Sequence, residues 1–334
     1  MAFSHRPMLA QDVRNAVKAA GAHPILAARY GCRLADLESV WLALLHLDAT
    51  QCGIFEEERG ATRRIAGVGF ATFVSDEFVR DMKTPPLRWI AREVIDRILA
   101  GESPVLSNRE VQEANSSGGL NAAVWQSGIR PEEFSAELAN EAITSFMEAH
   151  RGFLLKEIIT QPDCISSWTG IRNSGFLFFD AANGCYGEYP EECDVMQPYL
   201  LGMTQKLAGS TPGAWVSSNF FYRRPRVGFN RSEQRLLSCA LAGGTDEELA
   251  DRLRISISAV KKTWHSIYER VGSSLPELLP QCGTDGDMSE RGKGKKQRLV
   301  AYLRDHPEEL RPVSRRLLKS RVTRVPQGDF GEAD

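Results

Sequence analysis

Apolar residues in the first 220 positions switch between helical and strand spacing. Leu37, Trp41, Leu44 and Leu45 recur at close to 3.6 residues, which predicts helices across residues 9–47. The stretches CGIFEEE and RRIAGVGFATFVS, joined by RGAT, predict a β-hairpin. RWIAREVIDRILAGE predicts an amphipathic helix that ends at Gly101.

The later segments of this region are shorter and also mixed. LNAAVWQSGI, GFLFFDA and AWVSSNFFY are expected to be strands. Helices are expected from Pro131 to about Ile158, with a break near Gly152, and over EECDVMQPYLLGMTQKLAG. Together these elements predict an α/β (or α+β) N-terminal body over residues 1–222.

Residues 229–282 follow a helical pattern throughout and predict three short helices. The first ends at Gly243 and Gly244, Thr245 caps the second, and Ser256 caps the third after a tight turn at 254–256. The expected inward positions are Leu236, Leu237 and Ala240, then Leu249, Ala250 and Leu253, then Val260, Trp264, Ile267 and Val271. A helix, a second helix, a short turn and a third helix is the arrangement of a C-terminal all-α helix-turn-helix DNA-binding domain.

The third helix carries polar and cationic side chains away from its apolar stripe. Lysine can donate to guanine or neutralise phosphate, serine can bond to either, and isoleucine can touch a thymine methyl group. A cationic helix face is often only a solvated surface, so charge alone does not decide between the two interpretations. The candidate DNA-binding residues are Thr245, Ser256, Ile257, Ser258, Lys261, Lys262 and His265, with Ser266 also expected to face outward.

This block resembles the LuxR-type (GerE-type) helix-turn-helix of bacterial transcription regulators over Phe229 to Gly272 without a gap. The matching features are Glu233, Gly243, Thr245, Glu248 to Ala250, Leu253, Ile255-Ser256, Val260-Lys261, Ile267-Tyr268 and Val271-Gly272. The resemblance implies a DNA-binding domain that acts as a homodimer and controls transcription. Ala259, Lys262-Thr263 and the Pro-containing SSLPELLP depart from the family pattern.

Charge supports an anionic partner for the C-terminal third. Residues 1–222 hold 19 Lys and Arg against 27 Asp and Glu, whereas residues 223–334 hold 22 against 16. Residues 223–228 are interpreted as a linker, and residues 283–334 as a second linker, a short helix and a basic tail. The tail is expected to fray, or to contact phosphates or RNA polymerase.

The cysteines and the apolar runs argue against a metalloprotein and against a membrane protein. The seven cysteines are scattered without metal-ligand spacing, so no metal site is expected. No apolar run is long enough for a membrane span and no secretory signal is recognised, so a cytoplasmic protein is expected. No catalytic residue and no cofactor are assigned.

The N-terminal body is expected to sense a ligand or to dimerise. Trp125, Trp168 and Trp215 are candidate walls of a pocket for an unidentified small molecule, although buried tryptophans more often belong to a core.

One alternative for this body comes from IFEEERGATRRIAGVGFATFV and HRGFLLKEI, which resemble parts of GNAT acetyltransferases. In that family an R-x-x-G-x-G/A loop binds the acyl-CoA pyrophosphate; here Arg151-Gly152 match it and Leu154 does not. This resemblance implies an acyltransferase-like enzyme or a degenerate acyl-CoA sensor. The other alternative is a ligand-free protein that recruits RNA polymerase.

Overall fold

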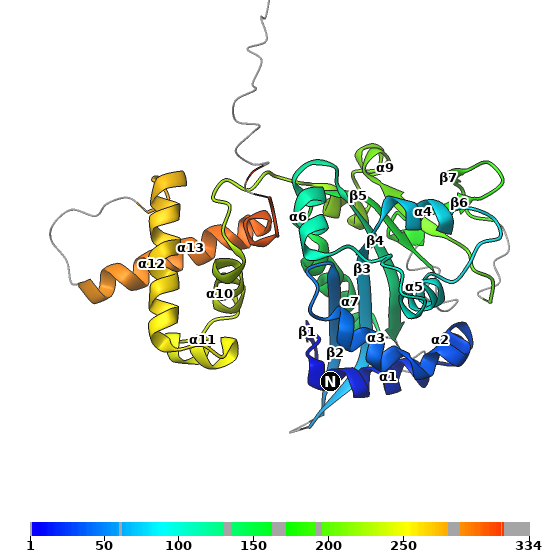
Figure 1. The fold of residues 1–334 in the computed structure, drawn as a ribbon, viewed down its shortest axis with the longest axis horizontal. Helices are drawn as coiled ribbons and strands as arrows, with labels where there is room; N and C mark the ends of the chain where they lie inside the picture. The colour runs from blue at the N-terminus through cyan, green and yellow to red at the C-terminus, as the bar shows by residue number, and fades with distance from the viewer. Residues whose placement is uncertain are drawn as a thin grey trace, which may run out of the picture. The chain divides into compact units, whose positions relative to one another are not determined.

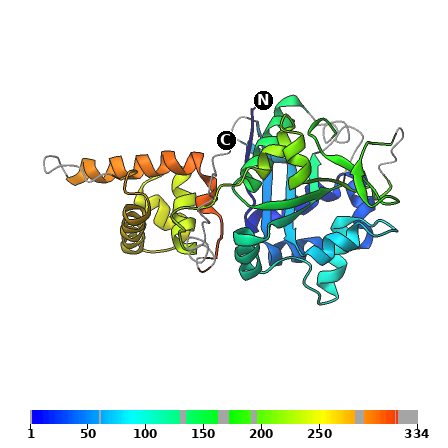
Figure 2. The same ribbon diagram turned by 90° about the horizontal axis from the view of Figure 1, so that it is seen from above.

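The chain forms two compact units (Figures 1 and 2). The computed structural model describes residues 2–59, 62–129, 135–161, 172–190, 196–279, 288–314 and 316. Unit 1 comprises Met1–Ala114 and Gly118–Tyr222, and unit 2 comprises Asn115–Ser117 and Arg223–Asp334.

Unit 1 is a mixed α/β body built on an eight-stranded sheet. The strands are β1 (Ala2–Pro7), β2 (Thr50–Arg59), β3 (Thr62–Val74), β4 (Leu120–Ile129), β5 (Leu155–Thr160), β6 (Leu177–Asp180), β7 (Cys185–Gly187) and β8 (Leu201–Thr204). Their order is β1-β2-β3-β4-β5-β8-β6-β7. The pairing of β4 with β5 is parallel and the other neighbouring pairs of these strands are antiparallel.

The helices of unit 1 are α1 (Val13–Gly21), α2 (Pro24–Tyr30), α3 (Leu37–Leu44), α4 (Asp76–Met82), α5 (Ile90–Leu99), α6 (Asn108–Ser117, with its last three residues in unit 2), α7 (Ala136–His150) and α9 (Gln205–Ser210). Short 3-10 turns are η1 (Ala10–Asp12), η2 (Gly31–Ala35) and η4 (Trp215–Phe220). The predicted helical start, the 50–74 hairpin and the helix before Gly101 are therefore confirmed.

Successive residues of a strand point to opposite faces of the sheet, and side chains on both sides of β3 are buried. Trp41 of α3 stacks on Phe70 of β3 with ring centroids 4.7 Å apart. Phe73 of the same strand packs instead against Phe153, at 4.7 Å, and against His150 at the end of α7. This double coverage explains why β3 contains a nearly continuous apolar run.

Three predicted elements of unit 1 are wrong. Leu155–Ile158, expected to continue the helix after a break near Gly152, belongs to strand β5, because these residues pair with β4. Leu201–Thr204, expected to be helical, is a strand because it pairs with β5, Leu201 lying opposite Thr160. Residues 215–220, expected to be a strand, form η4. There the Ser218 hydroxyl donates to the Trp215 carbonyl at 2.7 Å and the Asn219 amide to the Val216 carbonyl at 3.2 Å. Such local side-chain bonds compete with strand pairing.

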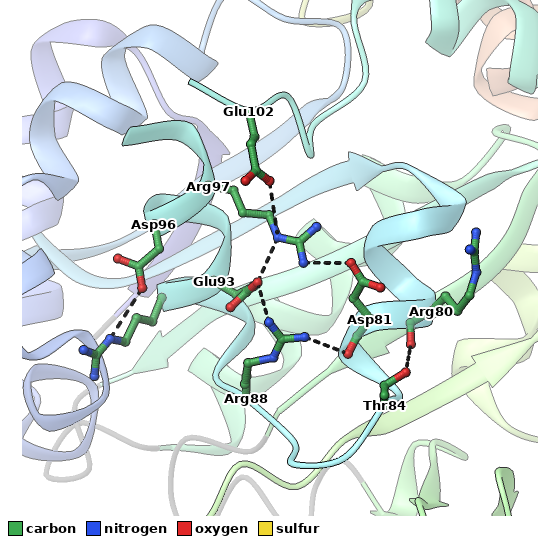
Figure 3. A network of polar contacts seen from close by, with 9 residues as sticks. Arg80, Asp81, Thr84, Arg88, Glu93, Asp96, Arg97 and Glu102 are labelled. Carbon is green, nitrogen blue, oxygen red and sulfur yellow. Dashed lines mark hydrogen bonds and ion pairs between the residues drawn. The ribbon is translucent and has the colours of Figure 1, made fainter. Parts of the chain in front are cut away.

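Charged side chains tie α4 to α5 (Figure 3). Arg97 donates to Glu93 and to Asp81, both at 2.8 Å. Arg88 donates to the same Glu93 oxygen at 2.8 Å and to the Asp81 carbonyl at 3.1 Å. Arg97 of α5 and Arg88 just before this helix are thus engaged within unit 1.

Unit 2 consists of helices over its described residues. They are α10 (Arg231–Leu241), α11 (Asp246–Leu253), α12 (Ile257–Ser274) and α13 (Met288–Asp305), followed by the 3-10 turn η5 (Pro307–Leu310). The three helices predicted between 229 and 282 are confirmed.

The interpretation of residues 283–296 as a linker is wrong in part, because α13 begins at Met288. In the view of Figure 1 α13 crosses α12, and its Leu299 and Leu303 are buried in the core of this unit. The short helix predicted over residues 297–310 is confirmed by the second half of α13 and by η5. The end of the predicted tail, from residue 317, lies outside the described residues.

Candidate nucleic-acid interface

A tight turn joins α11 to α12. Arg254 ends α11 in the left-handed conformation, with φ 55° and ψ 46°. Ser256 then caps α12, its hydroxyl oxygen accepting a hydrogen bond from the Ala259 amide at 3.1 Å. Thr245 caps α11 in the same way: its hydroxyl accepts from the Glu248 amide at 3.3 Å, and the Glu248 carboxylate accepts from the Thr245 amide at 2.9 Å. Both predicted caps are confirmed, and they fix where each helix begins.

The apolar stripe of α12 holds this helix against the rest of the unit. Val260, Ile267 and Val271 are fully buried, and Trp264 is 6% exposed. They share one core with α10 and α11 residues such as Leu237 and Leu249. The interpretation of Trp264 as a core residue is confirmed.

A buried carboxylate clamps α12 to α10. Glu233 accepts from the Ser266 hydroxyl at 2.7 Å and from Arg270 Nε at 3.0 Å, and it also accepts from the Asn230 amide at 2.7 Å. Burial raises the pKa of Glu233, but these hydrogen bonds outweigh it and the net pKa is lowered. The expectation that Ser266 faces outward is wrong, because its hydroxyl is used to fix α12.

The opposite face of α12 is exposed. Ile257, Ser258, Lys261, Lys262 and His265 are all exposed, as predicted. Their spacing of three and four residues places them along one side of the helix. His265 lies 3.7 Å from Glu269. Within the part of the chain that the structure describes, neither lysine forms an ion pair or hydrogen bond with another residue. The structure therefore brings five of the candidate residues together on one face, which starts at the Ser256 cap.

Helix α13 supports this face from behind, which the sequence pattern did not reveal. The Lys296 ammonium lies 5.2 Å from the centre of the Trp264 ring and 3.4 Å from Asp246 at the start of α11. A lysine interpreted as part of the second linker thus packs against two elements of the predicted helix-turn-helix.

A second buried carboxylate closes unit 2. Glu309 of η5 is 1% exposed and accepts from the Arg226 amide at 2.8 Å, the Val227 amide at 3.1 Å and the Tyr302 hydroxyl at 3.0 Å. Residues 226 and 227 were expected to be linker. The sequence around Glu309 does not indicate this role. Two of its partners, the Arg226 and Val227 amides, lie more than 80 positions earlier in the chain, and only Tyr302 is close in sequence.

The residues proposed to bind acyl-CoA in unit 1 do not form a phosphate-binding loop. Arg151 directly follows the last residue of α7, where a helix presents carbonyl oxygens rather than the N–H groups that bind phosphate. Arg151-Gly152 therefore lies at the wrong end of a helix for a pyrophosphate loop. The connection between β4 and α7, residues 130–134, is outside the described residues.

One small cavity in unit 1 is relevant to the expected ligand. It encloses about 340 Å³ of unfilled space, part of it open to solvent, and its narrow interior admits about one water. Trp125 and Gln161 are among its walls, but the Gln161 amide is already bonded to the Ile90 amide and the Arg88 carbonyl. Trp168 lies outside the described residues and Trp215 packs edge-on against Phe146. The small-molecule ligand stays a prediction.

Membrane-spanning helices and metal-binding clusters are both absent from the described ranges. No helix there combines the length and apolar character needed to cross a bilayer. No cluster of three or more His, Cys, Asp or Glu side chains in the same ranges is arranged to hold a metal ion. Burial raises the pKa of the Cys52 thiol to about 12.

Comparisons with solved structures found low structural similarity to several chains, two of them described as acetyltransferases. A GNAT-family acetyltransferase from Staphylococcus aureus Mu50 matches 61% of this chain and 99% of its own, with 10% identity and a TM-score of 0.33. An uncharacterized protein from Bacillus halodurans matches 66% of this chain and 92% of its own, with 12% identity and a TM-score of 0.34. An Aedes aegypti chain described as an arylalkylamine N-acetyltransferase matches 60% and 87%, with 11% identity and a TM-score of 0.34.

The sequence comparisons found no relatives. No family model matches the chain. No curated protein matches it either. Both family resemblances therefore rest on sequence: the LuxR-type resemblance on the pattern of residues 229–272, and the GNAT resemblance on the two segments quoted above.

Proposed function

We propose that this protein is a sequence-specific DNA-binding transcription regulator in which α12 enters the major groove. The observation that carries the proposal is the exposed face of α12: Lys261 and Lys262 form no ion pair or hydrogen bond with any residue that the structure describes. That face is fixed from below by the Trp264 stripe and by the Glu233 clamp.

The dimensions and charge of the face suit duplex DNA. An α-helix with its side chains is about 10–12 Å across, which fits the major groove at a width of about 12 Å. Arg254 precedes the helix and is exposed, so three cations lie along the turn and the first half of α12. Ser258 adds a hydroxyl between them.

The LuxR-type resemblance supplies the remainder of this proposal. It favours a homodimer, because two half-sites then double the contact with a palindromic operator. It also favours transcription control in the cytoplasm, with unit 1 sensing a ligand, dimerising or contacting RNA polymerase.

The test removes the two lysines from the full-length chain. We expect Lys261→Ala with Lys262→Ala to weaken binding to DNA fragments recovered from a genomic library by at least tenfold, since each lost contact costs about 1–3 kcal/mol. If both lysines neutralise phosphates, the slope of log K against log salt falls by about 1.8, or 0.9 for each.

The matched control removes two cations from unit 1. Arg14 and Lys18 lie one turn apart on α1 and are exposed. Arg14→Ala with Lys18→Ala changes the net charge by the same amount and is expected to leave both affinity and slope unchanged. Equal losses in the two double variants would mean that net charge, not α12, drives binding, and would reject the assignment of this helix.

The parallel pair β4–β5 favours a second candidate function for unit 1, acyl-CoA binding. The last paired residues are Val124 and Thr160, and β4 continues to Ile129 while β5 ends at Thr160. Ligands of α/β sheets bind beyond the carboxyl ends of parallel strands, and α7 begins on this side with Ser135 as its cap. An acyltransferase-like enzyme or a degenerate acyl-CoA sensor fits this place.

Calorimetry of the full chain with acetyl-CoA tests the second candidate. Binding heat, together with a rise in the thermal unfolding midpoint, is expected if unit 1 binds the thioester. Absence of both would end this proposal and would leave the DNA-binding proposal untouched.

A further inference from the structure

Two isoleucines flank the cap of α12 and are exposed. Ile255 is 41% exposed and Ile257 is 40% exposed, with Ser256 between them. The other large apolar side chains that are similarly exposed in the described residues, Leu9, Leu42, Leu99, Met196 and Phe221, all belong to unit 1. Unit 2 therefore shows its large exposed apolar side chains at one place, the start of α12.

The fold of unit 2 does not need these two side chains. The α11–α12 turn is made by backbone bonds, the Ile255 amide donating to the Ala250 carbonyl at 3.0 Å, and by the Ser256 cap. The buried core of the unit contains neither isoleucine. Two polar residues here would satisfy the turn equally well and would avoid exposing apolar surface to water.

The surroundings select the kind of partner. Arg254 lies beside Ile255, and Lys261 lies one helical turn after Ile257, so the apolar pair is bordered by cations. A complementary partner is anionic and offers small apolar groups among its charges. In the major groove of duplex DNA that apolar group is the 5-methyl group of thymine.

We propose that Ile255 and Ile257 read thymine methyl groups, so that the operator carries thymines opposite the start of each α12. This inference rests on the proposed DNA binding and adds to it the base that the apolar pair selects. Lysines then position the helix on phosphates or guanines, while the isoleucines discriminate thymine from cytosine and from uracil.

The experiment changes only the methyl group on the DNA. The probe is the duplex that the full-length protein retains most tightly from a pool of random 20-base-pair sequences, resynthesised with each thymine replaced singly by deoxyuridine. Deoxyuridine keeps the base pair and the O4 acceptor and lacks only the methyl group. We expect affinity to fall about fourfold at one or two neighbouring positions in each half-site, which is the contribution of burying one methyl group.

Two protein variants connect each methyl group with its isoleucine. Ile257→Ala is expected to bind the thymine and deoxyuridine probes equally at one position, and Ile255→Ala at its neighbour. Leu99→Ala, which truncates a comparably exposed leucine in unit 1, is expected to keep the full ratio. The deoxyuridine scan on the unaltered protein requires no variant, so it decides the matter even where a variant folds poorly.

The outcomes separate this inference from the function on which it rests. If no duplex is retained from the pool, DNA binding and thymine reading are both overturned. If a duplex is retained but every deoxyuridine probe binds with full affinity, only thymine reading is overturned, and the isoleucine pair then serves another partner such as a protein. A thymine-to-uracil ratio that persists in both isoleucine variants also overturns it.

Discussion

Helices α5 and α12 are both amphipathic and both carry cations, yet they use them differently. On α5, Arg97 is held by Glu93 and Asp81, and Arg92 lies 3.7 Å from Asp96. On α12, Lys261 and Lys262 form no ion pair or hydrogen bond with any described residue, and the charge of Lys261 acts only at longer range, where it helps to lower the pKa of Glu247. Arg270, on the inner side, is bound to Glu233. The comparison teaches that a cationic helix suggests a partner only after the carboxylates around it are known.

The largest effect is expected from removing Trp264, which holds α12 in the core of unit 2. Trp264→Ala removes a side chain that is 6% exposed, so we expect unit 2 to lose about 3–5 kcal/mol of unfolding free energy. Hydrogen exchange of α12 amides should accelerate strongly, while the amides of α5 stay protected. Unchanged protection of α12 would show that this stripe does not hold the helix.

The Glu233 clamp is the next largest. Glu233→Gln keeps the shape but removes the charge that Arg270 neutralises, so we expect a loss of about 2 kcal/mol. Because folding lowers the pKa of Glu233 from its ordinary value of 4.5, its contribution is fully present above about pH 4.5. It is lost as pH falls towards the lower pKa of the folded state. Acid unfolding of the variant, followed by α12 amide exchange, should lack this component; an identical pH profile would contradict the clamp.

The network on α5 gives the counterpart in unit 1. Arg97 has a side chain that is 17% exposed, and Arg97→Ala removes it from three carboxylates, those of Asp81, Glu93 and Glu102. We expect a loss of about 1.5 kcal/mol from unit 1, measured by urea unfolding. DNA affinity should not change, since these cations are used inside the fold. A drop in affinity comparable with that of the α12 lysine variant would erase the contrast between the two helices.

The smallest effect is a gain. Arg254 has φ 55°, a conformation that costs a residue with a side chain about 1 kcal/mol and glycine almost nothing. Arg254→Gly is therefore expected to stabilise unit 2 by about 1 kcal/mol in thermal unfolding. If Arg254 contacts phosphate, DNA affinity falls at the same time. Arg254→Lys separates the two effects, because lysine keeps the charge and the strained side chain and is expected to change neither stability nor affinity. An unchanged unfolding midpoint in Arg254→Gly would contradict the strain.

The spacing of apolar residues predicted correctly those helices that bury a single face. The stripe of Val260, Trp264, Ile267 and Val271 needed only helical periodicity, and the Thr245 and Ser256 caps needed only their own next three residues. The same holds for the exposed lysines, because a stripe that is buried leaves the opposite side outside.

Longer-range features were missed where the partner is distant in the sequence. The strand Leu201–Thr204 exists because β5 offers it a pairing edge, and its four residues carry too little periodicity to distinguish strand from helix. The burial of Glu309 depends on the Arg226 and Val227 amides.

The sequence by itself determined the three helices, their caps and the identity of the residues on the outer face of α12, because these depend on spacing within one helix or one turn. Tertiary structure decided the order of the eight strands, the inclusion of α13 in unit 2 and the inward use of Ser266 and Arg270. It also decided which cations already have partners. A charge is neutralised by whatever the fold brings within a few ångströms of it, and that distance is not written in the spacing of a single helix.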